Sequence, residues 1–479
     1  MMIPKEVKTI TQKLNRAGFE AYIVGGCVRD MLREKKPLDW DIATSAKPKE
    51  VQKLFPKSFY DNQFGTVGVL TGSKDKSLEV VEVTTFRTEA KYSDRRHPDS
   101  IKFAKSIKED LARRDFTINA MAYNPENKEL IDLFGGREDL KAGLVRAVGE
   151  AEERFKEDAL RLMRGVRFAT VLDFTLEGET LKAIQKNAPL LEEIAKERVK
   201  EELEKIIMSE RAHFGIMYLH EAGLLKYIMP ELERGIGITQ NHHHPYDCFY
   251  HGVYSLEYAA LNKYSLELRL AALLHDIGKP YVKEGLGSRA TFYNHAQYGA
   301  KVTETLLRRL KFSRKVVEQV SHLVRFHLFY YDADVVTESG VRRLLRRIGK
   351  ENAKDFIKLR MADRIGSRVP KAKPYRLRHL EYMFEKVAED PIDPTMLKID
   401  GNEVMALCKI EPGPRVGLLL EGLLQEVLDD PKRNKKTYLK KRVLELNSLS
   451  DKELKKKAEK VYKFKEEREQ ERKAKYWVK

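Results

Sequence analysis

The 479-residue sequence has few cysteines and no long apolar segment. Its three cysteines, Cys27, Cys248 and Cys408, lie far apart and form no CxxC pair, which argues against a zinc knuckle or a disulfide framework. No apolar run reaches the about 18 residues of a membrane-spanning helix, and the first residues lack the apolar core of a secretory signal. We therefore expect a cytoplasmic protein with reduced thiols and no membrane partner.

Acidic residues are outnumbered by basic ones. The chain has 90 Lys plus Arg against 73 Asp plus Glu, a formal net charge of +17 and a pI near 9.4. This surplus favours a polyanionic partner, and RNA is a better candidate than a membrane. The alternative is that 34% charged residues simply solvate a large, heat-adapted protein.

The stretch IVGGCVRDMLREKKPLDWDI combines a glycine pair with two aspartates one residue apart. Gly25 and Gly26 lack a Cβ, so the backbone there can turn tightly and point N–H groups at a triphosphate. Asp39 and Asp41 would point to the same side of an extended strand, where two carboxylates can hold Mg²⁺. The alternatives are an ordinary turn and a chance DxD, but Arg29 and Asp30 after the glycines favour nucleotide binding.

A second segment, RRDFTINAMAY at 113 to 123, brings paired arginines that can bind phosphate bidentately. Together with GGCVRD and LDWDIA it closely resembles the head domain of the class II tRNA nucleotidyltransferases, the family that also contains bacterial poly(A) polymerases. The resemblance continues through IDLFGGREDL at 131 to 140, EDALRLMRGVRFA at 157 to 169 and ERVKEELEKI at 197 to 206. Agreement of ordered motifs over roughly 180 residues is very unlikely by chance.

The resemblance implies roles for individual residues. Asp39 and Asp41 would hold Mg²⁺ and act as the catalytic carboxylates. The residues that would contact the nucleotide are Gly25, Gly26, Arg29, Arg114, Asp158, Arg161, Arg164 and Arg167. Glu82 is a candidate third carboxylate, although a strand glutamate more often faces solvent. Cys27 lies in the glycine loop without a nearby base, and we interpret it as a packing residue.

The motif EDALRLMRGVRF suggests how a base could be read without a template. If it is helical, Asp158 and Arg161 are neighbours three residues apart, and they present an acceptor beside donors. Cytosine and adenine present an amino donor beside a ring-nitrogen acceptor, whereas guanine and uracil present a carbonyl beside an N–H. The pair would therefore admit C and A and refuse G and U. The alternative is a surface ion pair.

Histidines in the middle of the chain give a separate signal. LLHDIGKP is similar to the HD superfamily of metal-dependent phosphohydrolases, and imidazole with carboxylate ligands suits a divalent transition metal or Mg²⁺. The resemblance places ligands at His251, His275, Asp276 and Asp363, with His295 and His327 at the additional positions of two-metal members. The run of histidines at 242 to 244 matches no ligand position and is interpreted as a loop cluster.

Periodicity predicts a small α+β sheet domain followed by largely helical segments. The resemblance implies that these are a nucleotidyltransferase head with a small mixed sheet, followed by largely all-α neck, body, HD and tail domains. We expect the head at 1–150, a helical neck and body with the base-reading helix at 151–235, the HD domain at 236–385 and a tRNA-binding tail at 386–479. The polar segment at 86 to 100 resembles the flexible loop that full CCA-adding and A-adding members carry and CC-only members lack; the alternative is an ordinary solvated loop. Basic stretches at 342 to 347, 368 to 379 and 432 to 442 are candidate tRNA surfaces, or else solvated faces.

The sequence thus predicts a template-independent CCA-adding tRNA nucleotidyltransferase that uses CTP, ATP and tRNA, with a probable HD phosphohydrolase activity. An A-adding tRNA nucleotidyltransferase and a poly(A) polymerase are the nearest alternatives. An HD phosphohydrolase whose head merely binds nucleotide is the alternative from another class.

Overall fold

The computed structural model describes residues 3–61, 65–89, 101–240, 245–285, 289–329, 331–333, 335–388 and 397–478. Most of the predicted loop at 86 to 100, and the histidines at 242 to 244, lie outside the described residues. The chain divides into two compact units, Met1–Arg325 with Ile365–Arg368, and Phe326–Arg364 with Val369–Lys479. Across the described ranges, no helix is both long and apolar enough to cross a membrane.

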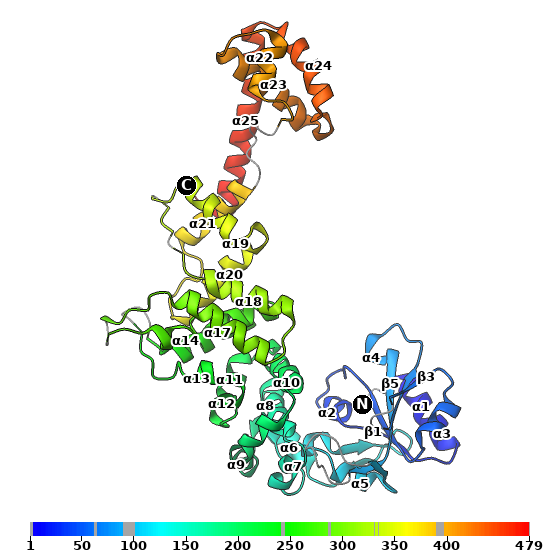
Figure 1. The fold of residues 1–479 in the computed structure, drawn as a ribbon. Helices are drawn as coiled ribbons and strands as arrows, with labels where there is room; N and C mark the ends of the chain where they lie inside the picture. The colour runs from blue at the N-terminus through cyan, green and yellow to red at the C-terminus, as the bar shows by residue number, and fades with distance from the viewer. Residues whose placement is uncertain are drawn as a thin grey trace. The chain divides into compact units, whose positions relative to one another are not determined.

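The first unit begins with a seven-stranded mixed sheet in the order β3-β4-β5-β2-β1-β8-β9 (Figure 1). Its strands are β1 (Ala21–Val24), β2 (Asp41–Thr44), β3 (Ser58–Asp61), β4 (Thr66–Leu70), β5 (Val80–Thr85), β8 (Met121–Tyr123) and β9 (Leu130–Asp132). Only β2 and β5 pair in parallel in this sheet; the other neighbours are antiparallel. A separate two-stranded ribbon joins β6 (Arg87–Glu89) to β7 (Ile101–Phe103).

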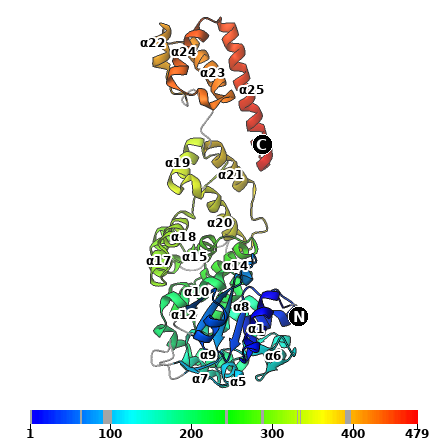
Figure 2. The ribbon, with the colours of Figure 1, turned by 90° about the vertical axis from the view of Figure 1, so that its right-hand side faces the viewer.

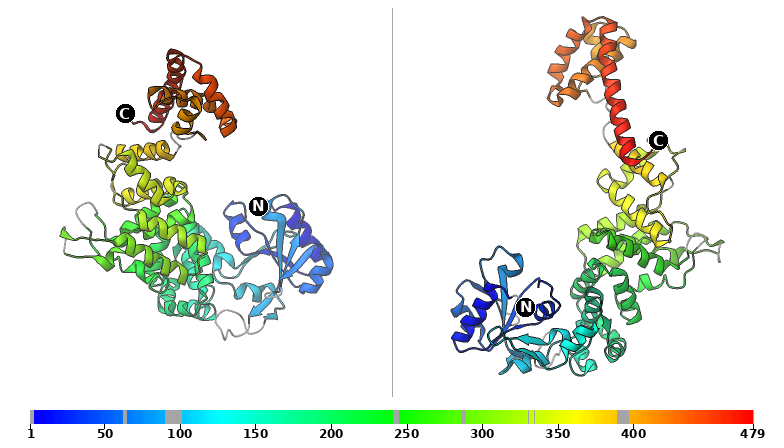
Figure 3. Two further views of the ribbon diagram at one scale, coloured as in Figure 1. Left: turned by 45° about the horizontal axis from the view of Figure 1, so that its top comes forward. Right: turned by 180° about the vertical axis from the view of Figure 1, so that it is seen from behind.

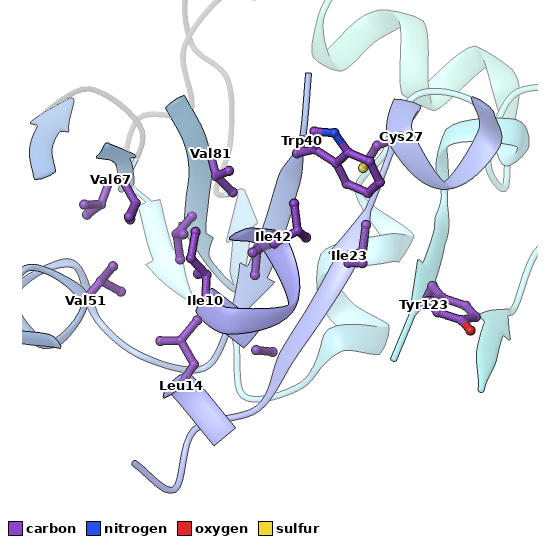
Figure 4. Close-up of a cluster of buried hydrophobic side chains, with 14 of the residues drawn as sticks. Ile10, Leu14, Ile23, Cys27, Trp40, Ile42, Val51, Val67, Val81 and Tyr123 are labelled. Atoms are coloured by element: carbon purple, nitrogen blue, oxygen red, sulfur yellow. The ribbon is translucent and has the colours of Figure 1, made fainter. Parts of the chain in front are cut away.

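Side chains alternate between the two faces of this sheet. Ile23 and Ile42 face a core that the helices α1 (Lys5–Arg16) and α3 (Pro48–Leu54) cover, and Figure 4 shows Ile10 and Leu14 of α1 in the same cluster, below Ile42 in this view. Their chain neighbours Val24 and Ala43 face the other side, where α5 (Ile107–Ala112) contributes to a smaller core. With period two along β2, Asp41 lies on this second face with Ala43.

The predicted α+β head is confirmed, with some strands that periodicity did not identify. The structure has strands within the predicted segments AYIVG, VGVLTG, LEVVEVTTF and SIKFA. The prediction missed β3, β8 and β9, which are three or four residues long and show no clear alternation, and it placed β6 in a loop.

The rest of the first unit is helical. Its longer helices are α7 (Ala151–Glu157), α8 (Leu160–Leu172), α9 (Gly178–Asn187), α10 (Lys196–Met208), α11 (Ala212–Glu221), α14 (Cys248–Leu261), α15 (Leu266–Leu274) and α17 (His295–Arg309). α8 packs against α10 and α11, and α14 packs against α15. Figure 3 shows this helical part of the chain in blue-green to green. The next helix, α18 (Arg314–Phe326), ends the first long segment of this unit.

Among its described residues, the second unit has helices joined by turns and no strand. It contains α19 (Glu338–Ile348), most of α20 (Ala353–Gly366), α21 (Tyr375–Ala388), α22 (Gly401–Cys408), α23 (Pro414–Asp429), α24 (Lys436–Asn447) and α25 (Asp451–Tyr476). α22, α23 and α24 share an apolar core with the start of α25, and Figure 2 shows α25 extending beyond that bundle. The charged C-terminal segment therefore forms a helix.

Candidate active site

The glycine pair forms the turn between β1 and α2 (Gly26–Leu32). Gly25 has φ +76°, a conformation that other residues rarely adopt. A Cβ on Gly25 would also lie 2.9 Å from Nη1 of Arg114 and 3.5 Å from Oδ2 of Asp41. The glycine is therefore required both by the turn and by the close approach of these two site residues.

Three acidic side chains gather at the start of β2. Asp39 precedes the strand, Asp41 is its first residue, and Glu82 of β5 is the Cα partner of Asp41 in the parallel pair. Burial, followed by the charges of Asp39 and Glu82, raises the pKa of Asp41 to about 7, against the opposing effect of Arg114. Glu82 is exposed to solvent, and its charge acts on Asp41. It therefore belongs to the acidic cluster, and its place as a third carboxylate stays a prediction.

All ten residues predicted for the head site line one pocket of about 570 Å³. They are Gly25, Gly26, Arg29, Asp39, Asp41, Arg114, Asp158, Arg161, Arg164 and Arg167. Eight arginines and four aspartates line this pocket in all, and the surplus of positive charge suits a triphosphate. The structure thus places all ten residues around one pocket, and the role of each remains a prediction.

Most of the pocket arginines are held by acidic or amide side chains. Asp110, 1% exposed, accepts from Nη2 of Arg113 at 2.8 Å and from Nη2 of Arg114 at 3.2 Å. Asp115 accepts from Arg164 at 2.6 Å. Burial alone would raise the pKa of Asp115, but Arg164 outweighs burial and lowers that pKa. These pairs fix the guanidinium groups in place before any ligand arrives.

Two further arginines are positioned in the same way. Arg29 donates from Nη1 to Oδ1 of Asn119 at 2.8 Å. Arg167 is bonded to Glu202 of α10, and its guanidinium carbon lies 3.9 Å from the centre of the Phe168 ring. The planar groups are thus oriented by both charge and stacking.

The predicted continuous helix through EDALRLMRGVRF is wrong at its beginning. Asp158 has an extended backbone, φ −135° and ψ 103°, between α7 and α8, and its Oδ1 accepts from the N–H of Leu160 at 3.0 Å. Its Oδ2 accepts from Nη2 of Arg198 at 3.2 Å. The pairing with α10 and the capping of α8 outweigh the helical tendency of the sequence, so Asp158 is not on the same helix as Arg161.

Arg161 is 7% exposed and its guanidinium is extensively bonded. Nη1 donates to Oε2 of Glu157 at 2.6 Å and to the carbonyl of Arg154 at 3.1 Å, and Nη2 donates to the carbonyl of Arg113 at 3.1 Å. It therefore ties the start of α8 to the Arg113 and Arg114 segment. The surface ion pair considered as an alternative does not describe this residue.

Several supporting residues were missed at the sequence level. They are Asp110, Asp115, Asn119, Glu157, Arg198 and Glu202. All but Asp110 lie inside the motifs quoted for the resemblance. Asp110 stands four residues before Arg114, and this i, i+4 spacing on a helix was the available signal.

A second cluster of titratable groups lies buried among α14, α15 and α17. Nε2 of His251 and Nε2 of His275 are 3.0 Å apart, and they lie 3.4 Å and 3.3 Å from Oδ2 of Asp276. Nε2 of His295 is 3.4 Å from Oδ1 of the same carboxylate. Nδ1 of His275 lies 2.9 Å from the carbonyl of Ala272, which favours a tautomer with Nε2 available as a ligand.

The charge of Asp276 is stabilised within this cluster. Burial alone would raise its pKa, but Lys279, His275 and His295 outweigh burial and hold that pKa well below its usual range. Nζ of Lys279 is 2.6 Å from Oδ2 of Asp276. Three buried nitrogen and oxygen ligands in mutual reach fit a divalent transition metal. His327 and Asp363 belong to the second unit, and their predicted places as ligands stay predictions.

Family models match three parts of the chain. Residues 21–146 match a poly A polymerase head domain, residues 173–236 match a probable RNA and SrmB-binding site of polymerase A, and residues 243–365 match an HD domain. The three matches follow the predicted order of head, neck and body, and HD domain.

Known proteins with similar sequences are CCA-adding enzymes. That of Limosilactobacillus reuteri is 48% identical over 227 residues, 47% of this chain and 55% of that protein. That of Lactiplantibacillus plantarum is 50% identical over 222 residues, 46% of this chain and 53% of that protein. The chain thus spans only about half the length of these curated relatives.

Solved structures extend the similarity over nearly the whole chain. The crystal structure of the Bacillus stearothermophilus CCA-adding enzyme in complex with CTP is 31% identical, with a TM-score of 0.61, and covers 93% of this chain and 98% of that one. The Thermotoga maritima CCA-adding enzyme complexed with tRNA has a TM-score of 0.53 over 92% of this chain, and at 22% identity it supports the fold alone.

Proposed function

Because this chain belongs to the CCA-adding enzyme family, we propose that it transfers CMP and AMP from CTP and ATP to the 3′ end of tRNA. In this reaction the RNA 3′ oxygen forms a bond to the α-phosphorus. The bond from that phosphorus to the bridging oxygen breaks, pyrophosphate leaves, and the hydroxyl proton passes to water.

The observation that carries the proposal is the pocket in which carboxylates and arginines meet. Asp39 and Asp41 stand at one part of its wall, and Arg29 and Arg114 stand close to the glycine turn. Charge develops on phosphate oxygens throughout a phosphoryl transfer, so fixed positive groups and a local cation are what this reaction needs from a protein.

The acidic cluster also fits a Mg²⁺ ion. The raised pKa of Asp41 results from burial beside other carboxylates, an arrangement that a bound cation would stabilise. Asp39 and Asp41 would hold the ion, with Glu82 beside them. When bound, Mg²⁺ would neutralise phosphate charge and lower the pKa of the attacking hydroxyl.

Base selection would use Asp158 as the acceptor for the exocyclic amino group of C or A. Arg198 holds its carboxylate from α10. Arg161 would donate a hydrogen bond to the ring nitrogen of the incoming base. To do so it would give up one of the hydrogen bonds that it makes in this structure. Guanine and uracil would meet Asp158 with a carbonyl oxygen, which leaves two acceptors facing each other.

The test is nucleotide addition to three tRNA transcripts, ending before CCA, after C and after CC, with labelled CTP and ATP. We expect growth to CCA from all three ends, and no growth with Asp39→Ala. Growth from the CC end alone would replace the proposal with an A-adding specialist. Long adenosine tails would replace it with a poly(A) polymerase.

We further propose a phosphohydrolase activity at the HD site, supported by the buried cluster of His251, His275 and Asp276. The substrates would be phosphomonoesters or 2′,3′-cyclic phosphates, such as damaged RNA 3′ ends. Hydrolysis should require Ni²⁺, Mn²⁺ or Mg²⁺, and His275→Ala should remove it while nucleotide addition persists. If the parent protein hydrolyses none of these substrates, or if His275→Ala hydrolyses them equally well, this second activity is refuted. Hydrolysis without nucleotide addition would favour the alternative of an HD phosphohydrolase whose head merely binds nucleotide.

The same proposal includes domain boundaries at 150, 235 and 385 and a tRNA substrate in the cytoplasm.

The proposal also includes contact of the tRNA backbone with the basic stretches at 342 to 347, 368 to 379 and 432 to 442. On α19, Arg342, Arg343 and Arg346 are exposed while Val341 and Leu345 are buried, so this helix presents a basic face. A tRNA backbone is a suitable partner for such a face.

A further inference from the structure

A second pocket, of about 300 Å³, opens beside the first on the same face of the head sheet. It shares Asp41, Arg87, Arg113 and Arg114 with the nucleotide pocket. The carboxylate of Asp41 therefore stands where the two spaces meet. A displacement at phosphorus needs the attacking and leaving oxygens roughly in line, with the nucleophile opposite the pyrophosphate. A space adjoining the acidic cluster is therefore suited to the RNA 3′ hydroxyl, which is the nucleophile of the proposed reaction.

The floor of this second pocket is fixed by the strand register. Phe59 of β3 is the Cα partner of Gly68 in β4, Gly68 is the partner of Glu82 in β5, and Glu82 is the partner of Asp41 in β2. Side chains at paired positions point to the same face of a sheet. One row across four strands thus runs from an aromatic ring to the acidic cluster.

The neighbouring row adds hydroxyl groups. Thr66 and Thr84 are Cα partners, and their Oγ1 atoms lie 3.0 Å apart. Both line the second pocket. A surface with an aromatic ring at one end, hydroxyls beside it and carboxylates at the other end matches the parts of a nucleoside, which has a π-face and ribose hydroxyls.

The Phe59 ring is unusually open for a side chain of this size. It is 52% exposed, and it lies over Gly68, where a Cβ would come within 2.4 Å of the ring. Such a ring can serve simply as apolar cover for a strand glycine. Its position in a polar pocket that leads to the acidic cluster indicates a further use, because a base can stack on an exposed ring whatever its identity.

We propose that this second pocket binds the 3′-terminal nucleoside of the acceptor RNA, with its base stacked on Phe59 and its ribose hydroxyls between the threonines and Asp41. The inference rests on the proposed function, because it supplies the RNA side of the same reaction. Stacking on Phe59 tolerates any base, so one subsite can accept an end that changes with each addition.

The experiment measures extension of tRNA ending in CC by Phe59→Ala, Phe59→Leu and Phe59→Tyr. Tyr60→Ala is the matched control, because Tyr60 is the adjacent exposed aromatic and pairs with Val67, which faces the opposite core. We expect Phe59→Ala and Phe59→Leu to lower kcat/KM for RNA about 5- to 150-fold, the range for loss of one stacked base. Phe59→Tyr and Tyr60→Ala should stay near the parent value, and ATP binding measured without RNA should not change.

A second measurement is independent of turnover. RNA ending in 2-aminopurine should lose fluorescence on binding the parent protein, because stacking quenches this base, and should lose less on binding Phe59→Ala. Full activity of Phe59→Leu would overturn the inference, since the ring would then only cover Gly68. Equal quenching by the parent and Phe59→Ala would overturn it as well. If the parent extends no RNA, the proposed function fails, and the quenching still decides whether the ring stacks on RNA.

Discussion

Asp41 should destabilise the head in the absence of a divalent cation, so that Asp41→Asn makes the cation-free protein more stable. The folded state holds the Asp41 proton up to about pH 7, whereas an ordinary aspartate releases it near 3.8. The folded state therefore binds more protons than the unfolded state between these values. Stability is lost as the pH rises through this window.

The size of the effect follows from the pKa difference. A tenfold change in proton affinity corresponds to about 1.4 kcal/mol, so the full penalty above pH 7 is about 4 kcal/mol as an upper limit. Partial solvent contact of Asp41 reduces this, and we expect Asp41→Asn to gain about 2–4 kcal/mol at pH 8. At pH 5 the same relation leaves at most about 1.6 kcal/mol.

Tryptophan fluorescence gives a specific assay for the head. The chain has two tryptophans; Trp40 is buried beside Asp41, and Trp477 is 79% exposed in the other unit. In a Trp477→Phe background, urea unfolding in EDTA at pH 5 and pH 8 would report the head alone. Excess Mg²⁺ should stabilise the parent and narrow the gap to Asp41→Asn, and exposed Glu126→Gln serves as the control.

The reasoning would be refuted if the parent were as stable as Asp41→Asn in EDTA at pH 8. It would also be refuted if Mg²⁺ stabilised both proteins equally. The first outcome would mean that Asp41 carries no electrostatic penalty, and the second would mean that Asp41 does not hold the cation.

Two further predictions concern the base-reading wall. Asp158→Ala should reduce the preference for CTP and ATP over GTP and UTP more than it weakens triphosphate binding. The reason is that the Asp158 carboxylate, held by Arg198, is the proposed acceptor for the amino group of the base. Unchanged selectivity in an assay with all four nucleotides would contradict this. Arg164→Ala should lower the free energy of unfolding by about 1–3 kcal/mol, because it removes the ion-pair partner of buried Asp115 and leaves that carboxylate with the N–H of Phe116 as a hydrogen-bond donor. A melting curve unchanged from the parent would contradict this.

The parts of the site that depend on local backbone geometry could be predicted from the sequence. Gly25 and Gly26 form the expected turn, and the spacing of Asp39 and Asp41 places both on one pocket wall. The turn needs only the conformational freedom of glycine. The period of a strand places Asp41 but not Asp39, because Asp39 precedes β2 instead of lying in the expected strand. The candidate metal ligands His251, His275 and Asp276 meet because the LLHDIGKP motif and α14 pack together.

The parts that depend on distant partners could not be predicted. Asp158 leaves the helix because Arg198, 40 residues later, pairs with its carboxylate. Phe59 was missed because β3 has only four residues and its role emerges from register with Gly68 and Glu82. Propensity describes neighbours along the chain, whereas these contacts are decided by tertiary packing.

The most direct test of the central claim is a crystal structure of this protein soaked with CTP or ATP and Mg²⁺. The account predicts a metal ion held by Asp39 and Asp41 against the triphosphate, with the base at Asp158 on the opposite wall. A triphosphate bound away from Asp39 and Asp41 would contradict it.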